Sequence, residues 1–332
     1  MTGVELARRL YEDHLAATLD VPHAAALLGW GSDVLGYDDA RSHDHGFGPR
    51  LLLFVDDVRV AEAVEQALPD EVAGFATRFG WDDVPVTHHV LVAELGAWLE
   101  GRLGFDASRG VTTLDWLLTP QQRLLEVTAG AVFNDDGRLA SVRSTLAWYP
   151  DDVWLWVLAA QWRRIAQEES FAGRAAERGD ELGSRVIAAR LARDLMRLCF
   201  LLERRYAPYA KWLGTAFAEL PLAGEVGPAL SAALSAAGWP EREDGLVAAY
   251  EAVARRQVEL TPGPDPAARR YYSRPFRVSG GDRFADACLE QISDRRLRTL
   301  PLIGAIDQVT DSTDALHPHR WRSLATLYPG VS

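Results

Sequence analysis

The residues of this chain that are best placed to do chemistry lie in one short stretch near its amino end. Trp30-Gly31-Ser32-Asp33 follows an apolar lead-in, and Asp44 comes after Ser32 with eleven residues between them. A Gly-Ser pair lets backbone amides approach a phosphate closely, and the serine hydroxyl can add a hydrogen bond. A carboxylate is a ligand that Mg²⁺ prefers, with substrate phosphates completing its shell. The spacing therefore predicts a site that holds phosphate groups at Gly31 and Ser32 and Mg²⁺ at Asp44. The plainer alternatives are a tight turn that needs glycine and a loop aspartate that caps nearby amides.

A second carboxylate is missing beside Asp44. Glycine stands two residues after it, at Gly46, and serine stands two residues before it, at Ser42. Because two-metal chemistry depends on paired acids, one carboxylate alone holds Mg²⁺ poorly. The loop offers other acids that could supply the missing charge: Asp33, Asp38 and Asp39.

Histidine and arginine side chains flank the same loop. His43 and His45 lie on either side of Asp44, and His45 could donate to a phosphate or take a proton. A His-x-His pair also suggests a transition metal, but the spacing places no third ligand. Arg50 begins an apolar run and could bind a phosphate through two parallel hydrogen bonds. The alternative for Arg50 is a salt bridge to Asp56 or to a helix end.

Two stretches of the second half carry further candidates. Of the 35 basic residues only Lys211 is a lysine, and it follows Tyr206-Ala-Pro-Tyr209. A compact ammonium is a good phosphate partner, although an aromatic-packed helix junction is the alternative. Polar residues near the end, Asp307-Gln308 and Asp311 to Asp314, could line a pocket for an acceptor molecule. The widespread use of arginine looks like a coding bias, so single arginines carry little functional weight.

The elements that must position these residues can be read from apolar spacing. Ala24 to Leu28 predicts a short strand or helix end, and Leu51 to Val55 predicts a strand buried on both faces. Further expected elements are a helix over 58–68 capped by Asp57, a strand over 84–95, a helix over 95–103 and a hairpin over 131–139. From Pro150 onward, long stretches with apolar residues at three- and four-residue spacing predict a helical bundle. We therefore expect an α+β domain over 1–148 followed by an α-helical domain over 149–332.

Composition limits the possible partners. The 332 residues are 48% hydrophobic and 25% charged, with a formal net charge of -12, which argues against a nucleic-acid partner. Cys199 and Cys288 lie far apart in apolar helical patterns and are expected to be buried free thiols. No signal-peptide pattern and no apolar stretch long enough for a membrane span is present, so we expect a cytoplasmic protein without membrane contact.

With these residues in view, the chain resembles a bacterial family of unknown function that has a polymerase-beta-type nucleotidyltransferase-like core and a helical C-terminal domain. The resemblance is carried by GWGSDVLGYDDARSHDHGFGPRLLLFV, YPDDVWLW, FAGRAAERGDELGS, RRYAPYAKWLGTAF and LPLIGAIDQVTDSTDAL. It implies a mixed sheet domain, a cleft-closing helical domain and transfer of a nucleotidyl group from a nucleoside triphosphate to a small-molecule acceptor with Mg²⁺.

The resemblance also implies roles for single residues. Gly31, Ser32 and Asp33 would belong to the phosphate site, and Asp44 to the metal site. Glu94, the only acid on the strand where the nucleotidyltransferase core often has a third carboxylate, would be the base. Arg50 and Lys211 would neutralise charge on the leaving pyrophosphate. The family pattern requires Asp-apolar-Asp/Glu, and this chain has Asp44-His45-Gly46 instead.

That departure leaves further functions open. The fold could bind a nucleotide or metabolite without transfer, or it could run a different reaction that uses His45. The acceptor and the oligomeric state also stay open.

Overall fold

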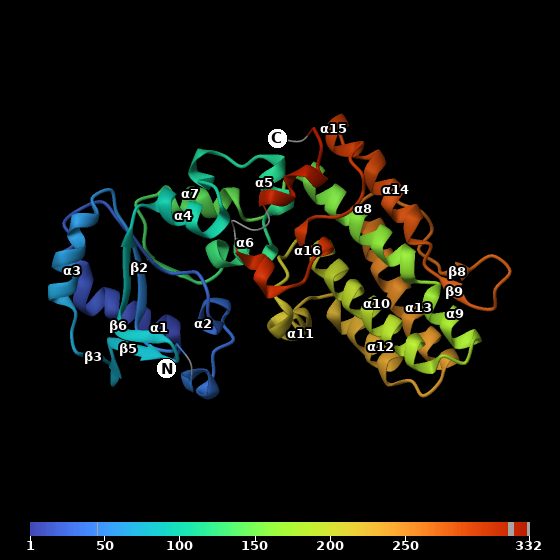
Figure 1. Cartoon of the computed structure of the whole chain (residues 1–332), viewed down its shortest axis with the longest axis horizontal. Helices are drawn as coiled ribbons and strands as arrows, with labels where there is room; N and C mark the ends of the chain where they lie inside the picture. Colours follow the sequence, from blue (N-terminus) through green and yellow to red (C-terminus); the bar gives the residue numbers. More distant parts are fainter. Residues whose placement is uncertain (45, 318–321, 331–332) are drawn as a thin grey trace. The chain divides into compact units, whose positions relative to one another are not determined.

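The chain folds into two compact units. The computed structural model describes residues 1–44, 46–317 and 322–330, without the side chain of Asp44 (Figure 1). The first unit contains residues 1–111, 122–147 and 316–322, and the second contains residues 112–121, 148–315 and 323–332. The first unit thus has no residue between 148 and 315. Two short segments, 112–121 and 316–322, belong to the opposite unit from the one that their position in the sequence suggests.

The first unit is built on a mixed five-stranded sheet with the order β5-β6-β2-β1-β7. Its strands are β1 (Ala24–Leu27), β2 (Arg50–Phe54), β5 (Arg78–Trp81), β6 (Val84–Ala93) and β7 (Ala131–Asn134). β1 pairs antiparallel with both β2 and β7, β2 pairs parallel with β6, and β5 pairs antiparallel with β6. The expected α+β class with a mixed sheet is therefore confirmed.

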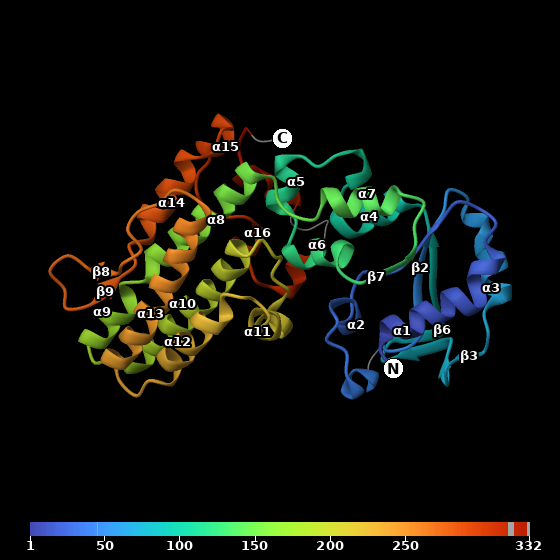
Figure 2. The ribbon, with the colours of Figure 1, turned by 180° about the vertical axis from the view of Figure 1, so that it is seen from behind.

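Both faces of β2 are covered, as its continuous apolar run predicts. Leu51 and Leu53 belong to a core cluster with Leu6 and Leu10 from the first helical stretch, α1 (Gly3–Arg9) and the π-helical turn Leu10–Leu15. Figures 1 and 2 both show α1 alongside the strands. On the alternate face Phe54 contacts Trp98 of α4 (Leu95–Leu103), with ring centroids 5.2 Å apart. Successive side chains of a strand point to opposite faces, so Leu51 and Leu53 lie on one face of β2 and Phe54 lies on the other.

The remaining elements of the first unit are short. They are α2 (Ser32–Leu35), α3 (Ala61–Ala67), β3 (Glu71–Val72), β4 (Phe75–Ala76), α7 (Arg138–Thr145), most of α6 (Gln121–Thr128) and 3₁₀ turns at Ala16–Thr18, Ala40–Asp44, Val58–Val60 and Ala107–Arg109. Asp57 caps the turn before α3 by accepting from the amide of Arg59, as expected. The expected hairpin over 131–139 is wrong, because only β7 forms. The Asp135 carboxylate accepts from the amides of Gly137 and Ala140 and so starts α7 where the second strand was expected.

The second unit is a helical bundle, as expected. Its helices are α5 (Thr113–Leu118), α8 (Asp151–Glu168), α9 (Phe171–Glu177), α10 (Glu181–Leu202), α11 (Ala210–Ala218), α12 (Ala223–Ser235), α13 (Trp239–Leu260), α14 (Gly281–Glu290), α15 (Arg295–Arg298) and α16 (Ile306–Val309). A two-stranded ribbon, β8 (Arg269–Arg270) and β9 (Arg277–Val278), and 3₁₀ turns at Thr313–Leu316 and Arg322–Leu327 complete the described chain.

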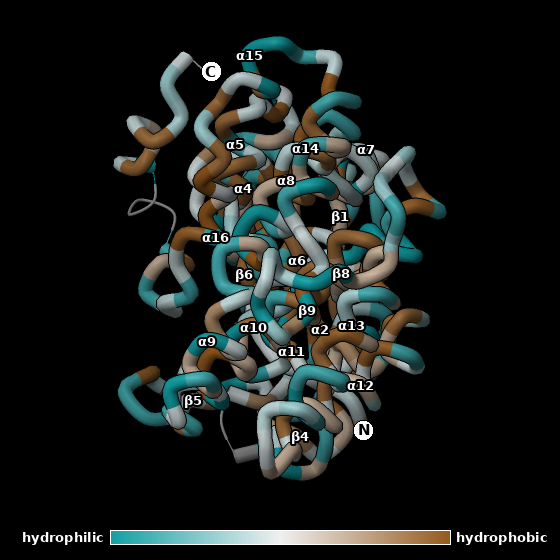
Figure 3. The backbone as a smooth tube through the Cα atoms, turned by 90° about the vertical axis from the view of Figure 1, so that its right-hand side faces the viewer, coloured by the Kyte–Doolittle hydropathy of each residue, from teal (hydrophilic) through white to brown (hydrophobic). Residues whose placement is uncertain are grey.

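Apolar stripes of the long helices form the core of the bundle. Trp162 of α8 stacks on Phe284 of α14 at 4.5 Å between ring centroids and donates its Nε1–H to Gln257 of α13 at 3.0 Å. Hydrophilic and hydrophobic positions alternate along the helices (Figure 3), which is the pattern of helices with one buried side. Among the described residues, no helix combines the length and the apolar character that a membrane crossing requires.

Candidate functional site

The Gly31–Ser32 loop and the start of β2 lie at one edge of the sheet. β1 and β2 are antiparallel, with Ala26 opposite Leu52, so the residues after β1 come close to those that begin β2. α2 begins at Ser32, whose hydroxyl lies 3.4 Å from that of Ser42. The structure thus brings the loop together with Arg50, as the sequence predicts.

Arg50 and Asp33 engage each other at this edge. One terminal nitrogen of Arg50 donates to both carboxylate oxygens of Asp33, at 2.5 and 2.7 Å, and the two side chains are only 9% and 5% exposed. The other terminal nitrogen donates to the carbonyl oxygen of Trp30 at 3.1 Å, and the guanidinium lies 4.3 Å from the Trp30 ring. Of the roles considered for Arg50, the structure shows a salt bridge, with Asp33 rather than with Asp56.

Gly31 permits this close packing. Its φ is 127°, and a Cβ added there would lie 2.2 Å from Asp33 Oδ1 and 2.5 Å from the Arg50 nitrogen. Neither the backbone angle nor the space suits a residue with a side chain. A buried ion pair thus accounts for the glycine that the sequence assigns to phosphate binding.

The other acids of the loop hold the backbone. Asp38 accepts a hydrogen bond of 2.7 Å from the amide of Gly3, and Asp39 accepts from the amides of Arg41 and Ser42 at 2.8 and 3.2 Å. The Asp44 side chain, expected to bind Mg²⁺, and His45, expected to move a proton, lie outside the described residues.

Two indoles fill the space beside the position where the second acid is missing. Gly46 has a φ of 66°, and a Cβ added there would lie 3.1 Å from the Trp30 ring and 3.3 Å from the Trp81 ring. The two indole rings lie 5.6 Å apart, and Trp30 is 39% exposed. Phe79 and His89 extend the cluster, and burial lowers the pKa of His89 below its usual value. These aromatic residues were not predicted from the sequence, although the position of Trp30 directly before Gly31 was a signal.

Glu94, the expected base, lies at the other end of the strands. β2 and β6 run parallel with Arg50 opposite His89 and Phe54 opposite Ala93, so Glu94 follows the end of β6 that is remote from Arg50. Arg50 and Phe54 are four residues apart on β2, which corresponds to roughly 13 Å along the strand. The register therefore separates Glu94 from the Gly31–Ser32 loop, and a base role beside that loop does not fit.

A pocket of about 560 Å³ surrounds Glu94 in the first unit, where Asp56, Asp106 and Asp136 also contribute carboxylates. Arg138 forms ion pairs with Asp56 and, at 2.6 Å, with Asp136. The hydrogen bond from Arg138 is the main cause of the lowered pKa of Asp136. These acids are thus partly neutralised within the pocket.

Lys211 belongs to the second unit. It lies exposed at the start of α11, with its ammonium 5.0 Å from the ring of Trp212. Nearby in sequence, Tyr206 is buried against Trp148 and Tyr149, and burial raises the pKa of its hydroxyl. The surroundings of Tyr206 therefore agree with the alternative expected for this segment, an aromatic-packed helix junction.

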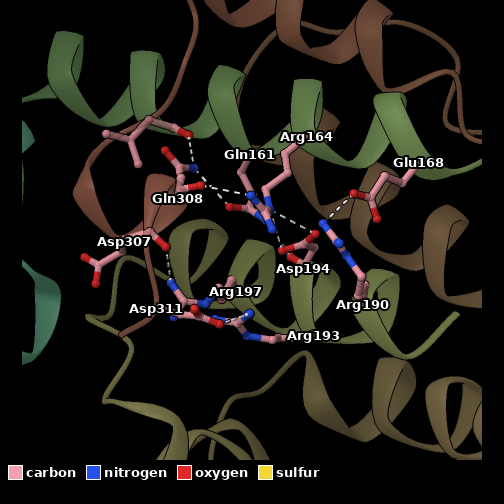
Figure 4. A network of polar contacts seen from close by, with 11 residues as sticks. Gln161, Arg164, Glu168, Arg190, Arg193, Asp194, Arg197, Asp307, Gln308 and Asp311 are labelled. Atoms are coloured by element: carbon pink, nitrogen blue, oxygen red, sulfur yellow. Dashed lines mark hydrogen bonds and ion pairs between the residues drawn. The ribbon is translucent and has the colours of Figure 1, made fainter. Parts of the chain in front are cut away.

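Asp307, Gln308 and Asp311 line a pocket of about 320 Å³ within the second unit. The Asp311 carboxylate pairs with Arg193 of α10, and the carbonyl oxygens of Asp307 and Gln308 accept from Arg197 of α10 and Arg164 of α8 (Figure 4). The acidic stretch was expected to line a pocket for an acceptor molecule, whereas the arginines were not predicted, because single arginines carried little functional weight. Their spacing on α10, at residues 190, 193 and 197, was the available signal, since it places all of them on one helix face.

Comparison with known proteins gives a partial family match. A model of a domain of unknown function, DUF4037, matches residues 116–213, which include all of α8 and α10. The expected resemblance to a family of unknown function is thus confirmed over that segment. No curated protein shows significant similarity to the chain.

The chain is also similar to a solved structure, that of a nucleotidyltransferase-like protein from Exiguobacterium sibiricum 255-15. The identity is 12% and the TM-score 0.35, over 77% of this chain and 76% of that one. This similarity is too distant to indicate a function.

Proposed function

We propose that the first unit binds a nucleotide beside the Gly31–Ser32 loop without transferring a nucleotidyl group. The observation that carries the proposal is the packing of Gly46 against the indoles of Trp30 and Trp81 at the position where paired-acid chemistry needs a second carboxylate. The loop carboxylate closest in the sequence to Ser32, that of Asp33, is held by Arg50 and is buried. Neither position supplies a second metal ligand.

The binding half of the proposal rests on the loop and on Trp30. The Gly-Ser turn between antiparallel strands offers backbone amides and a hydroxyl to phosphate groups. The indole of Trp30 is 39% exposed directly before that turn, with the Arg50 guanidinium against its ring. An exposed aromatic face is a surface on which a base can stack with little dependence on base identity. In this proposal Arg50 supports the indole and does not bind phosphate.

Nucleotidyl transfer with Mg²⁺ to a small-molecule acceptor is the second candidate. It is favoured by the spacing of eleven residues between Ser32 and Asp44, together with the antiparallel β1–β2 pair that brackets them. In that case Asp44 would hold the metal and a group other than Glu94 would serve as base, because the register removes Glu94 from this edge.

Calorimetric titration with ATP, GTP, CTP and UTP, with and without Mg²⁺, tests the proposal when it is paired with a pyrophosphate-release assay in the presence of a set of small-molecule hydroxyl compounds as acceptors. We expect at least one nucleotide to bind with or without Mg²⁺, and no pyrophosphate to be released. Trp30→Ala should weaken binding about tenfold, because stacking on an aromatic side chain contributes roughly 1–3 kcal/mol per base. Tyr272→Ala removes another exposed aromatic ring, in the second unit, and should leave binding unchanged.

Two variants separate the candidates. Release of pyrophosphate that depends on Mg²⁺ and is lost in Asp44→Ala would establish transfer and contradict binding alone. Gly46→Asp introduces a carboxylate at the position of the missing second acid. We expect this variant to release no pyrophosphate, because its Cβ would press on the indoles of Trp30 and Trp81. Failure of all four nucleotides to bind would contradict both candidates.

A further inference from the structure

The pocket of about 320 Å³ in the second unit is lined by equal numbers of arginines and aspartates. Arg164 of α8 and Arg190, Arg193 and Asp194 of α10 line it together with the stretch Asp307–Asp311. Figure 4 shows these residues on α8, α10 and the segment that contains α16. The volume lies at the low end of the range for small-molecule sites, roughly 300–1,000 Å³.

Arg164 is held firmly in position. Its Nε donates to both carboxylate oxygens of Asp194, at 2.9 and 3.1 Å, and Asp194 is only 3% exposed. One terminal nitrogen of Arg164 also donates to the carbonyl oxygen of Gln308 at 2.9 Å. Gln308 is itself fixed, because its amide donates to Gln161 at 2.9 Å. These contacts keep one guanidinium at the pocket wall without rotamer freedom.

Arg193 has a weaker partner. Its terminal nitrogen lies 2.7 Å from the carboxylate of Asp311, whose side chain is 62% exposed. Asp311 follows α16 on a stretch without regular secondary structure. Exposed ion pairs of this kind contribute little to stability, so another anion can replace the Asp311 carboxylate at small cost.

Further positive charge lies around Arg193. Arg190 pairs with Glu168 at 2.6 Å and keeps 55% of its side chain exposed. Arg197 donates from one terminal nitrogen to the carbonyl oxygen of Asp307 at 2.9 Å, and within the described chain its buried Nε has no hydrogen-bond partner. Arg164, Arg190 and Arg193 thus line the pocket itself, and Arg197 contacts the backbone of the segment that completes it.

We propose that this pocket binds a small phosphate-bearing molecule and that its phosphate displaces Asp311 from Arg193. Planar guanidinium groups form paired hydrogen bonds with phosphate as they do with carboxylate, and a phosphate group offers three acceptor oxygens that can reach more than one arginine. The exposed Asp311 occupies the phosphate position as an internal anion until the ligand arrives. The site lies within the second unit and does not depend on the nucleotide proposal for the first.

Titration with inorganic phosphate at constant ionic strength, followed by ³¹P NMR line broadening and calorimetry, tests this site. Arg193→Gln should weaken binding about tenfold or more, the size expected for losing a charge-assisted hydrogen bond. Asp311→Asn should tighten binding several-fold, because it removes the competing internal anion. An exposed arginine of the same helix, Arg185, provides the matched control, since Arg185→Gln removes the same charge away from the pocket.

A merely structural ion pair would not make Arg193→Gln weaken phosphate binding while Asp311→Asn tightens it. Equal phosphate binding by wild type and Arg193→Gln overturns the proposal, and so does weaker binding by Asp311→Asn. Absence of phosphate binding in both wild type and Asp311→Asn overturns it as well. Acetate at the same ionic strength should not compete, and equal competition by acetate would contradict a phosphate-specific site. Trp30→Ala should leave phosphate binding unchanged, which separates this result from the nucleotide experiment.

Discussion

Asp33→Asn tests whether Asp33 stabilises the Gly31–Ser32 loop through its buried ion pair with Arg50 or instead serves to bind a ligand. Asp33 and Arg50 are almost fully buried, and one nitrogen of Arg50 contacts both carboxylate oxygens. Replacing the carboxylate by a neutral amide keeps the shape of the side chain. It leaves the Arg50 charge buried without its partner. The free energy of unfolding of the first unit should therefore fall in the absence of any ligand.

The magnitude follows from the burial. Breaking a buried pair by removing one partner costs roughly 3–5 kcal/mol, because the remaining charge is uncompensated. Arg50 keeps its hydrogen bond to the Trp30 carbonyl oxygen and its contact with the Trp30 ring, so the lower end applies, about 3 kcal/mol. In the double variant Asp33→Asn/Arg50→Met no charge is left buried, and it should recover a large part of the loss.

Hydrogen exchange of peptides from β1 and β2 is the suitable assay, because a chain of two units need not unfold in one step. A loss of about 3 kcal/mol corresponds to roughly a hundredfold faster exchange of the protected amides. Glu12→Gln is the control, since Glu12 and its partner Arg8 are half exposed. Exchange in Asp33→Asn as slow as in Glu12→Gln would refute the structural role of the pair. It would return Asp33 to the group of ligand-binding candidates.

Two further predictions concern buried titratable groups in the second unit. Glu169 accepts hydrogen bonds from Ser279 and Gly280, yet burial raises its pKa above the ordinary 4.5. The folded state then binds a proton more tightly than the unfolded state. Glu169 therefore makes its full contribution to the free energy of unfolding below pH 4.5, where it is protonated in both states. This contribution is lost as the pH rises through the raised pKa of the folded state. Urea midpoints measured from pH 4 upward should fall for wild type relative to Glu169→Gln, and parallel curves would contradict this reasoning. Burial also raises the pKa of Cys288 to about 12 and that of Cys199 further, so neither thiol should react with Ellman's reagent before unfolding. Rapid labelling of the native protein would show that these helices open.

Local elements followed from the sequence where a single strong pattern decided them. The apolar run 51–55 predicted a strand covered on both faces, and the helix over 95–103 begins and ends where its spacing indicated. The segment over 131–139 shows the limit of such patterns. Its turn residues suit a hairpin, but they also suit a helix start, and the Asp135 contacts to backbone amides select the helix.

Apolar spacing was enough to predict the class of each half of the chain, because periods of two and of 3.6 residues reflect burial that every strand or helix must satisfy. The sequence also identified the Gly31–Ser32 loop and its missing acid. The pairing of charged side chains could not be predicted, because it depends on how distant segments pack. Strand register placed Arg50 beside Asp33 and Glu94 at the far end of the sheet, and packing of the α16 segment against α8 and α10 brought Asp311 to Arg193. A side chain's charge is fixed by its residue type, whereas its partner depends on contacts between segments far apart in the sequence.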